Sequence, residues 1–168
     1  MRRVLCVVTG EVAEIFSISG NQVVARATVP LGAHTLLRTI ASHAGVSLHA
    51  ARSGLSLVDT APGHQHPGPA WLHEPLSSAA THFANNFKDV AGALGSDASS
   101  VLVIAPEPLG ELFASILANS QQVNKLFPQG GVVRALRSHH LVPHVSASTQ
   151  PLDLVLMAEA LFAHKNLL

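Results

Sequence analysis

The sequence predicts an α/β domain built on a mixed five-stranded sheet with helices on both faces. Three β-type runs follow one another at the start of the chain, and a stretch of helical periodicity comes after them. A buried strand and a further short strand are expected in the second half, separated by a helical pattern. Strands joined by tight turns pair antiparallel, whereas strands joined by helical crossovers pair parallel, so the later strands should add parallel to the first.

The first three strands are expected to form an antiparallel meander. An apolar, β-branched run over Val4–Val8 suits a strand that is buried on both faces. A second run spans 12–18, and Gly20 then marks a tight turn because glycine tolerates positive φ. Val23–Val29 alternates between two faces, as a strand with one buried face does.

Two helices and a long loop are expected next. Apolar residues fall at helical spacing from His34 onward, and Gly45 is a suitable stop for that helix. Ser47 can cap a second, shorter helix over 48–59. The segment 60–75 contains four prolines, which predict an exposed loop.

The second half is expected to contain three helices and two strands. Their signals are helical apolar stripes and short β-branched runs, bounded by proline or glycine. We expect irregular structure over 121–131 and a loop or partial helix over 138–150. The five elements are a helix over 76–94, a strand over Ser99–Ala105, a helix over 109–117, a strand over Val132–Leu136 and a helix over 151–162.

The resulting order is three strands and a helix, a helical insertion, and two further strand–helix units. This is the ribonuclease-H-like layout. A chain of 168 residues is about one domain by length. We therefore expect a single domain over 1–168, with a reduced helical and loop insertion at about 47–98.

Charged residues are scarce and suggest a partner. They make up 12% of the chain, about half the usual share, while 48% of the residues are hydrophobic. A surface so poor in charge is expected to be partly covered by another domain, by a protein partner or by a second copy of the chain. The net charge is zero and no basic patch is visible, which argues against a nucleic-acid partner.

The compartment is expected to be the cytoplasm. No stretch approaches the roughly 20 apolar residues of a spanning helix, and the short apolar run after the N-terminus is unlike a signal peptide. The single cysteine, Cys6, rules out a disulfide framework within the chain and fits a reducing compartment.

The residues after the first strand resemble actin-like ATPases. The run VVTGEVAEI looks like the second phosphate-binding motif of the actin, heat-shock-70 and sugar-kinase superfamily. RATVPLGAHTLLRTIASHAGVSLHAARSGLSL is similar to the following segment in the cell-division protein FtsA and the type IV pilus assembly protein PilM. VLVIAPEPLGELFASIL resembles the adenosine motif, and STQPLDLVLMAEALFAHK looks like the closing helix. The resemblance corresponds to the second lobe of these proteins alone.

The resemblance implies where ATP and Mg²⁺ would bind if the site were intact. The cofactor-binding positions would be Thr9, Gly10, Glu11, Glu14, Gly32, Ala105 and Glu107. However, Val7 stands where a carboxylate would hold the metal, and Ala13 replaces a threonine. Ala105 and Pro106 replace two glycines, and proline has no N–H to donate. We therefore expect a degenerate site with no catalytic residue and no bound cofactor.

Other chemistry is less well supported by the sequence. The histidines of the two His-rich loops lack the spacing and carboxylate partners of a metal site, so no metal is expected there. These histidines are His64, His66, His73, His139, His140 and His144. A ribonuclease-H-type nuclease shares the fold but needs converging carboxylates for two metal ions, and Val7 removes the central one.

The expected function is therefore a scaffold or assembly role of the FtsA/PilM type, in cell division or pilus assembly. The alternative is an ATP-binding lobe that works only when a missing first lobe completes it. We also expect the edge formed by residues 9–14 and 105–109 to be apolar, uncharged and used for protein interaction.

Overall fold

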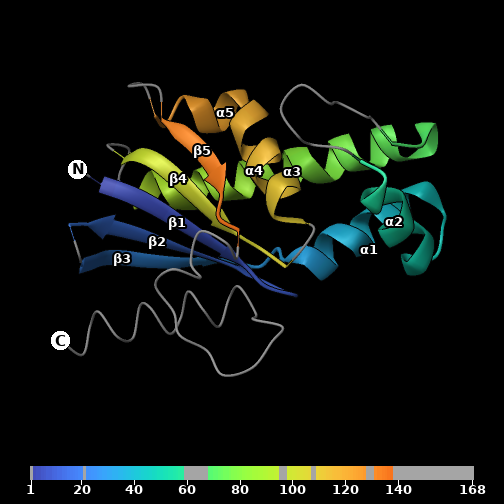
Figure 1. Ribbon diagram of the computed structural model, residues 1–168, viewed down its shortest axis with the longest axis horizontal. Coiled ribbons are helices and arrows are strands. Elements are labelled where there is room, and N and C mark those ends of the chain that lie inside the picture. Colours follow the sequence, from blue (N-terminus) through green and yellow to red (C-terminus); the bar gives the residue numbers. More distant parts are fainter. Residues whose placement is uncertain are drawn as a thin grey trace.

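The structure is a computed structural model that describes residues 2–20, 22–58, 68–94, 98–106, 109–127 and 131–137. Five strands form one sheet in the order β3-β2-β1-β4-β5 (Figure 1). The first three pair antiparallel, and β4 and β5 add parallel to β1. The predicted mixed sheet is therefore confirmed. The strands are β1 (Arg2–Val8), β2 (Ala13–Ser19), β3 (Gln22–Val29), β4 (Ala98–Ile104) and β5 (Val132–Ala135).

The described helices lead away from the sheet and return to it (Figure 1). α1 carries the chain to α2 at the far end of the molecule, and the long α3 packs along α1 on the way back. The helix predicted over 151–162 lies outside the described residues. The described elements are α1 (Ala33–Ala44), α2 (Leu48–Ser56), the 3-10 turn η1 (Ala70–Leu72), α3 (His73–Ala93), α4 (Leu109–Asn119) and α5 (Gln121–Asn124).

The junction between α1 and α2 has the predicted capping residues. Gly45 adopts a left-handed conformation with φ +64°, and its N–H donates to the Ala41 carbonyl. The Ser47 hydroxyl accepts from the Ala50 N–H at 3.2 Å, which satisfies one of the free amides of the first turn of α2. These two caps fix the direction in which α2 leaves α1.

The core lies between one face of the sheet and the helices α1, α3 and α4. Val4, Cys6 and Val8 point into it from β1 and are almost fully buried. The rings of Phe83 in α3 and Phe113 in α4 meet there at 4.9 Å between centroids. The intervening residues of β1 are only partly buried, so β1 is not buried equally on both faces as its apolar run predicts.

Two local predictions are wrong. The segment expected to be a loop up to residue 75 contains η1 and the first turn of α3, which begins at His73. Pro75 fits there because the first N–H groups of a helix have no partner within it. The segment expected to be irregular after Ser120 begins with α5, and the Ser120 hydroxyl caps it by accepting from the Val123 N–H at 3.3 Å.

Gly54 in α2 has a packing role. An added Cβ would lie 2.7 Å from the Trp71 ring, so the absence of a side chain lets η1 pack closely against α2. Glycine lowers the helix propensity of α2, and the close contact with the Trp71 ring offsets this cost.

Candidate functional site

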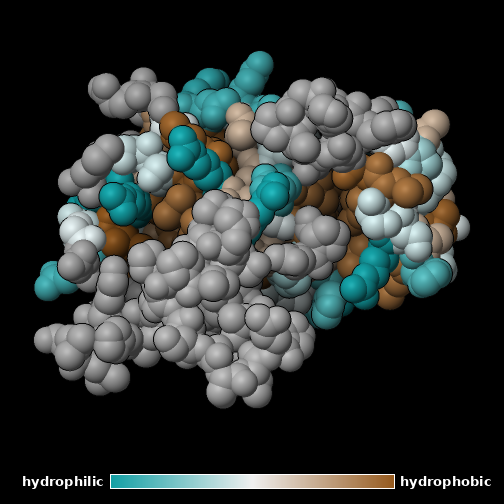
Figure 2. Space-filling view, viewed as in Figure 1, coloured by the Kyte–Doolittle hydropathy of each residue, from teal (hydrophilic) through white to brown (hydrophobic). Residues whose placement is uncertain are grey.

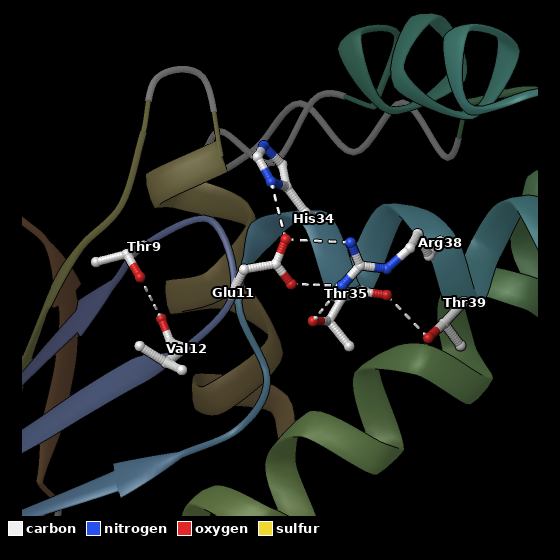
Figure 3. Close-up of polar contacts among 7 residues, drawn as sticks. All are labelled: Thr9, Glu11, Val12, His34, Thr35, Arg38 and Thr39. Atoms are coloured by element: carbon white, nitrogen blue, oxygen red, sulfur yellow. Dashed lines mark hydrogen bonds and ion pairs between the residues drawn. The ribbon is translucent and has the colours of Figure 1, made fainter.

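The candidate site is the loop between β1 and β2, residues 9–12, together with the first turns of α1 (Figure 3). The backbone N–H and the hydroxyl of Thr9 both donate to the Val12 carbonyl, at 2.8 and 2.9 Å. These bonds close the loop into a tight turn. The Thr9 hydroxyl is therefore used inside the loop.

The loop is hydrogen-bonded to the N-terminus of α1. The Ala33 N–H donates to the Thr9 carbonyl at 2.8 Å, and the His34 N–H donates to the Gly10 carbonyl at 2.7 Å. Amides at a helix N-terminus are potential anion-binding groups because they have no partner within the helix. Here these two amides are occupied by the loop, which replaces the capping side chain that Gly32 lacks.

Gly32 allows this close approach. An added Cβ would lie 2.5 Å from the Gly10 carbonyl oxygen and 2.6 Å from the Glu11 carbonyl carbon. Its φ of −112° is open to any residue, so the need for glycine comes from lack of space. An added Cβ at Gly10 would meet only the His34 ring, at 3.0 Å.

Glu11 belongs to a charged cluster with two residues of α1. The Arg38 guanidinium donates to both carboxylate oxygens of Glu11, at 3.1 Å for Nη1 and Oε1, and His34 Nδ1 lies 3.4 Å from Oε1. The hydrogen bonds from Arg38 lower the pKa of Glu11. Figure 3 shows the carboxylate facing α1 between these side chains. Glu11 therefore stays ionised and joins the loop to α1.

Glu14 is directed to a different partner. It pairs with Arg26 on the neighbouring strand β3, and the Arg26 guanidinium lies 5.6 Å from the centre of the Phe16 ring. Both contacts are made across β2 and β3, where opposite-charge and cation–aromatic pairs stabilise the sheet. The Glu14 carboxylate is thus not part of the Glu11 cluster.

The second predicted loop begins at the same edge of the sheet. Val7 pairs with Ile104, so Ala105 follows β4 beside the end of β1. Ala105 is 1% exposed and adds to the core. The Leu109 N–H, at the start of α4, donates to the Pro106 carbonyl at 2.8 Å. Glu107 lies outside the described residues.

The expectation of an uncharged edge is wrong. Glu11, His34 and Arg38 have side chains that are 60%, 65% and 52% exposed, so the loop presents charge to solvent. Sequence reasoning missed the roles of His34 and Arg38. Their spacing of four residues on α1 places them on one helix face, and this was the available signal for a basic surface.

No group of three or more metal-ligating side chains occurs within the described ranges. Of the histidines in the two His-rich loops, only His73 lies in that part of the chain. Among the helices that the structure describes, none is long and apolar enough to cross a bilayer.

Several solved structures resemble this fold, and two of them illustrate the likeness. One is the ethanolamine utilization protein EutJ from Carboxydothermus hydrogenoformans, with a TM-score of 0.56 and 14% identity over 80% of this chain. The other is the PilM–PilN type IV pilus biogenesis complex, with a TM-score of 0.52 and 10% identity over 70% of this chain. The chain has an actin-like ATPase fold. At these identities the likeness concerns the fold alone.

The actin-like chain spans less than half of either neighbour. The matched part is 44% of the EutJ chain and 33% of the chain from the PilM–PilN complex. No protein-family model matches the sequence, and no curated protein matches it.

Proposed function

We propose that this actin-like chain is an assembly protein of the FtsA/PilM type, which acts through protein contacts and has a degenerate nucleotide site. The main support is the state of the loop between β1 and β2. Its neighbouring amides, on Ala33 and His34, donate to loop carbonyls, and its carboxylate, on Glu11, is held by Arg38. The two α1 amides that could bind phosphate and the carboxylate that could hold a hydrated metal ion are therefore already paired within the protein.

Three substitutions support the loss of nucleotide chemistry. The side chain of Val7, one residue before the end of β1, offers no oxygen to a cation. Ala105 is buried and Pro106 lacks an N–H, so the second loop has neither the space nor the donor that two glycines would give. One structural neighbour comes from the PilM–PilN complex, which supports a protein partner for this chain as well.

One alternative has a specific observation in its favour. The chain spans less than half of either structural neighbour, which fits an ATP-binding lobe that a separate first lobe completes. In that case, nucleotide would bind only when both lobes are present.

The test combines turnover with self-association. We expect no Mg²⁺-dependent release of phosphate from ATP and no saturable ATP binding by calorimetry. We also expect the chain to self-associate, so that its sedimentation coefficient rises with protein concentration. A stable contact of this kind should bury about 1,000 Å² or more. ATP turnover that is lost in Gly10→Trp, by a chain that stays monomeric, would refute the assembly role.

A further inference from the structure

A pocket of about 370 Å³ lies between α1 and α2. Two leucines give it apolar walls, and four basic side chains surround them. Leu48, at the start of α2, is 53% exposed. Figure 2 shows hydrophobic and hydrophilic surface side by side at this end of the molecule. The residues of this α1–α2 pocket are His34, Leu37, Arg38, Leu48, His49 and Arg52.

The pocket has little acidic charge to balance its arginines. Residues 33–58, which include both helices, contain two arginines, three histidines and no aspartate or glutamate. Glu11 reaches Arg38 from the hairpin loop and neutralises it. Arg52 has no ion-pair or hydrogen-bond partner in the part of the chain that the structure describes. The pocket therefore keeps a positive charge next to exposed leucine surface.

These features fit a peptide better than a nucleotide. Among the described lining residues there is no phenylalanine, tyrosine or tryptophan, so the imidazoles of His34 and His49 are the only rings on which a base could stack. A free phosphate would use the basic groups but leave Leu37 and Leu48 without a partner. An acidic peptide with an apolar side chain matches both, because carboxylates pair with guanidinium groups and apolar side chains gain from burial.

We propose that the α1–α2 pocket binds an acidic, leucine-containing peptide segment of a partner protein. An apolar side chain of that segment packs on Leu37 and Leu48, and its carboxylates pair with Arg52. The inference rests on the proposed assembly role and gives the chemistry of the partner. It also makes Glu11 a competitor, because its carboxylate occupies Arg38, which a bound peptide could otherwise use.

The probe is a fluorescein-labelled peptide, Glu-Glu-Leu-Leu-Glu-Glu, measured by anisotropy against the full chain. A peptide with glutamine in place of each glutamate is the neutral control. We expect saturable binding of the acidic peptide, at least about tenfold tighter than the neutral one at 50 mM NaCl. The difference should shrink at 500 mM NaCl because salt screens exposed charges.

Two substitutions should change affinity in opposite directions. Arg52→Glu should weaken binding by about tenfold, which corresponds to about 1.4 kcal/mol. Glu11→Gln should tighten it because Arg38 loses its internal partner. Arg134→Glu, on the exposed side of β5, is the matched control and should leave affinity within about twofold. Trp71 fluorescence checks that each variant is folded. If Arg52→Glu does not fold, Arg52→Gln takes its place in the binding measurement.

The proposal is overturned if no peptide binds saturably, if the neutral peptide binds as tightly as the acidic one, or if substitution of Arg52 leaves affinity unchanged. Equal weakening by Arg134→Glu would also overturn it, because binding would then depend on overall charge. ATP turnover bears on the proposed function alone, so the two proposals can fail separately.

Discussion

Replacing Gly32 with alanine should be among the most damaging single-methyl changes in this chain. The new Cβ would lie 2.5 Å from the Gly10 carbonyl oxygen and 2.6 Å from two backbone carbons. These are backbone atoms, so no rotamer change can relieve the overlap. The hairpin loop would have to move away from α1, and the bonds from the Ala33 and His34 amides would lengthen or break.

The expected cost can be estimated from these contacts. Overpacking in a tight site costs about 1–3 kcal/mol, and each of the two backbone hydrogen bonds contributes about 0.5–1.5 kcal/mol. Together they predict a loss of about 2 to 6 kcal/mol in the free energy of unfolding. A domain of this kind has only about 5–15 kcal/mol in total, so the variant should lose a substantial share of its stability.

Urea unfolding measures this loss, with the fluorescence of Trp71, the single tryptophan, as the signal. Two matched glycine variants serve as controls. Gly10→Ala meets only the His34 ring and should cost no more than about 1.5 kcal/mol. Gly92→Ala, in α3, has its nearest contact at 3.6 Å and should gain about 0.5–1 kcal/mol from helix propensity.

A Gly32→Ala variant within about 0.5 kcal/mol of the parent would refute the proposed packing of the loop on α1. The same conclusion would follow if Gly10→Ala were the more damaging of the two. Either result would mean that the loop carbonyls do not cap the helix as described.

Three further predictions follow from particular residues. Burial raises the pKa of Cys6 to about 12. Iodoacetamide at pH 8 should therefore label the unfolded chain and leave the native chain unmodified, as measured by mass spectrometry. Rapid labelling of the native chain would contradict this. The pKa of Glu11 lies below its ordinary value of 4.5 because of Arg38, so its contribution to stability is present above pH 4.5 and lost as the pH falls through the lower folded-state pKa. Urea midpoints against pH should therefore be flatter in Glu11→Gln, and an identical profile would argue against the ion pair. Ser47→Ala removes the cap of α2 and should cost about 1 kcal/mol in urea unfolding; no loss would mean that the hydrogen bond to Ala50 contributes nothing.

Much of the fold could be predicted because it depends on local patterns. The alternation over Val23–Val29 appears in the structure as alternating exposed and partly buried residues, with Val29 fully buried. Gly45 and Ser47 cap their helices because cap preferences act over one turn. The start of α3 was harder to predict because proline usually signals a loop but is tolerated in a first helical turn.

The candidate site was less predictable. The contact between Glu11 and Arg38 joins residues 27 positions apart and depends on how α1 packs against the hairpin. Nothing in the local sequence of the loop indicates that its carbonyls accept from α1. The charges at this edge could be counted from the sequence, but their pairing required the tertiary structure.

The central place of β1 in the sheet has a consequence for synthesis on the ribosome. One edge of β1 pairs with β2, which comes next in the sequence. The other edge pairs with β4, which is synthesised much later; in that pairing Arg2 lies opposite Ala98. Arg2 and Ala98 are 96 positions apart, so at about 5–20 residues per second the ribosome takes roughly 5 to 19 seconds to reach Ala98 after Arg2. During that interval the nascent chain exposes an apolar strand edge, which is where a chaperone or a neighbouring nascent chain could pair with it.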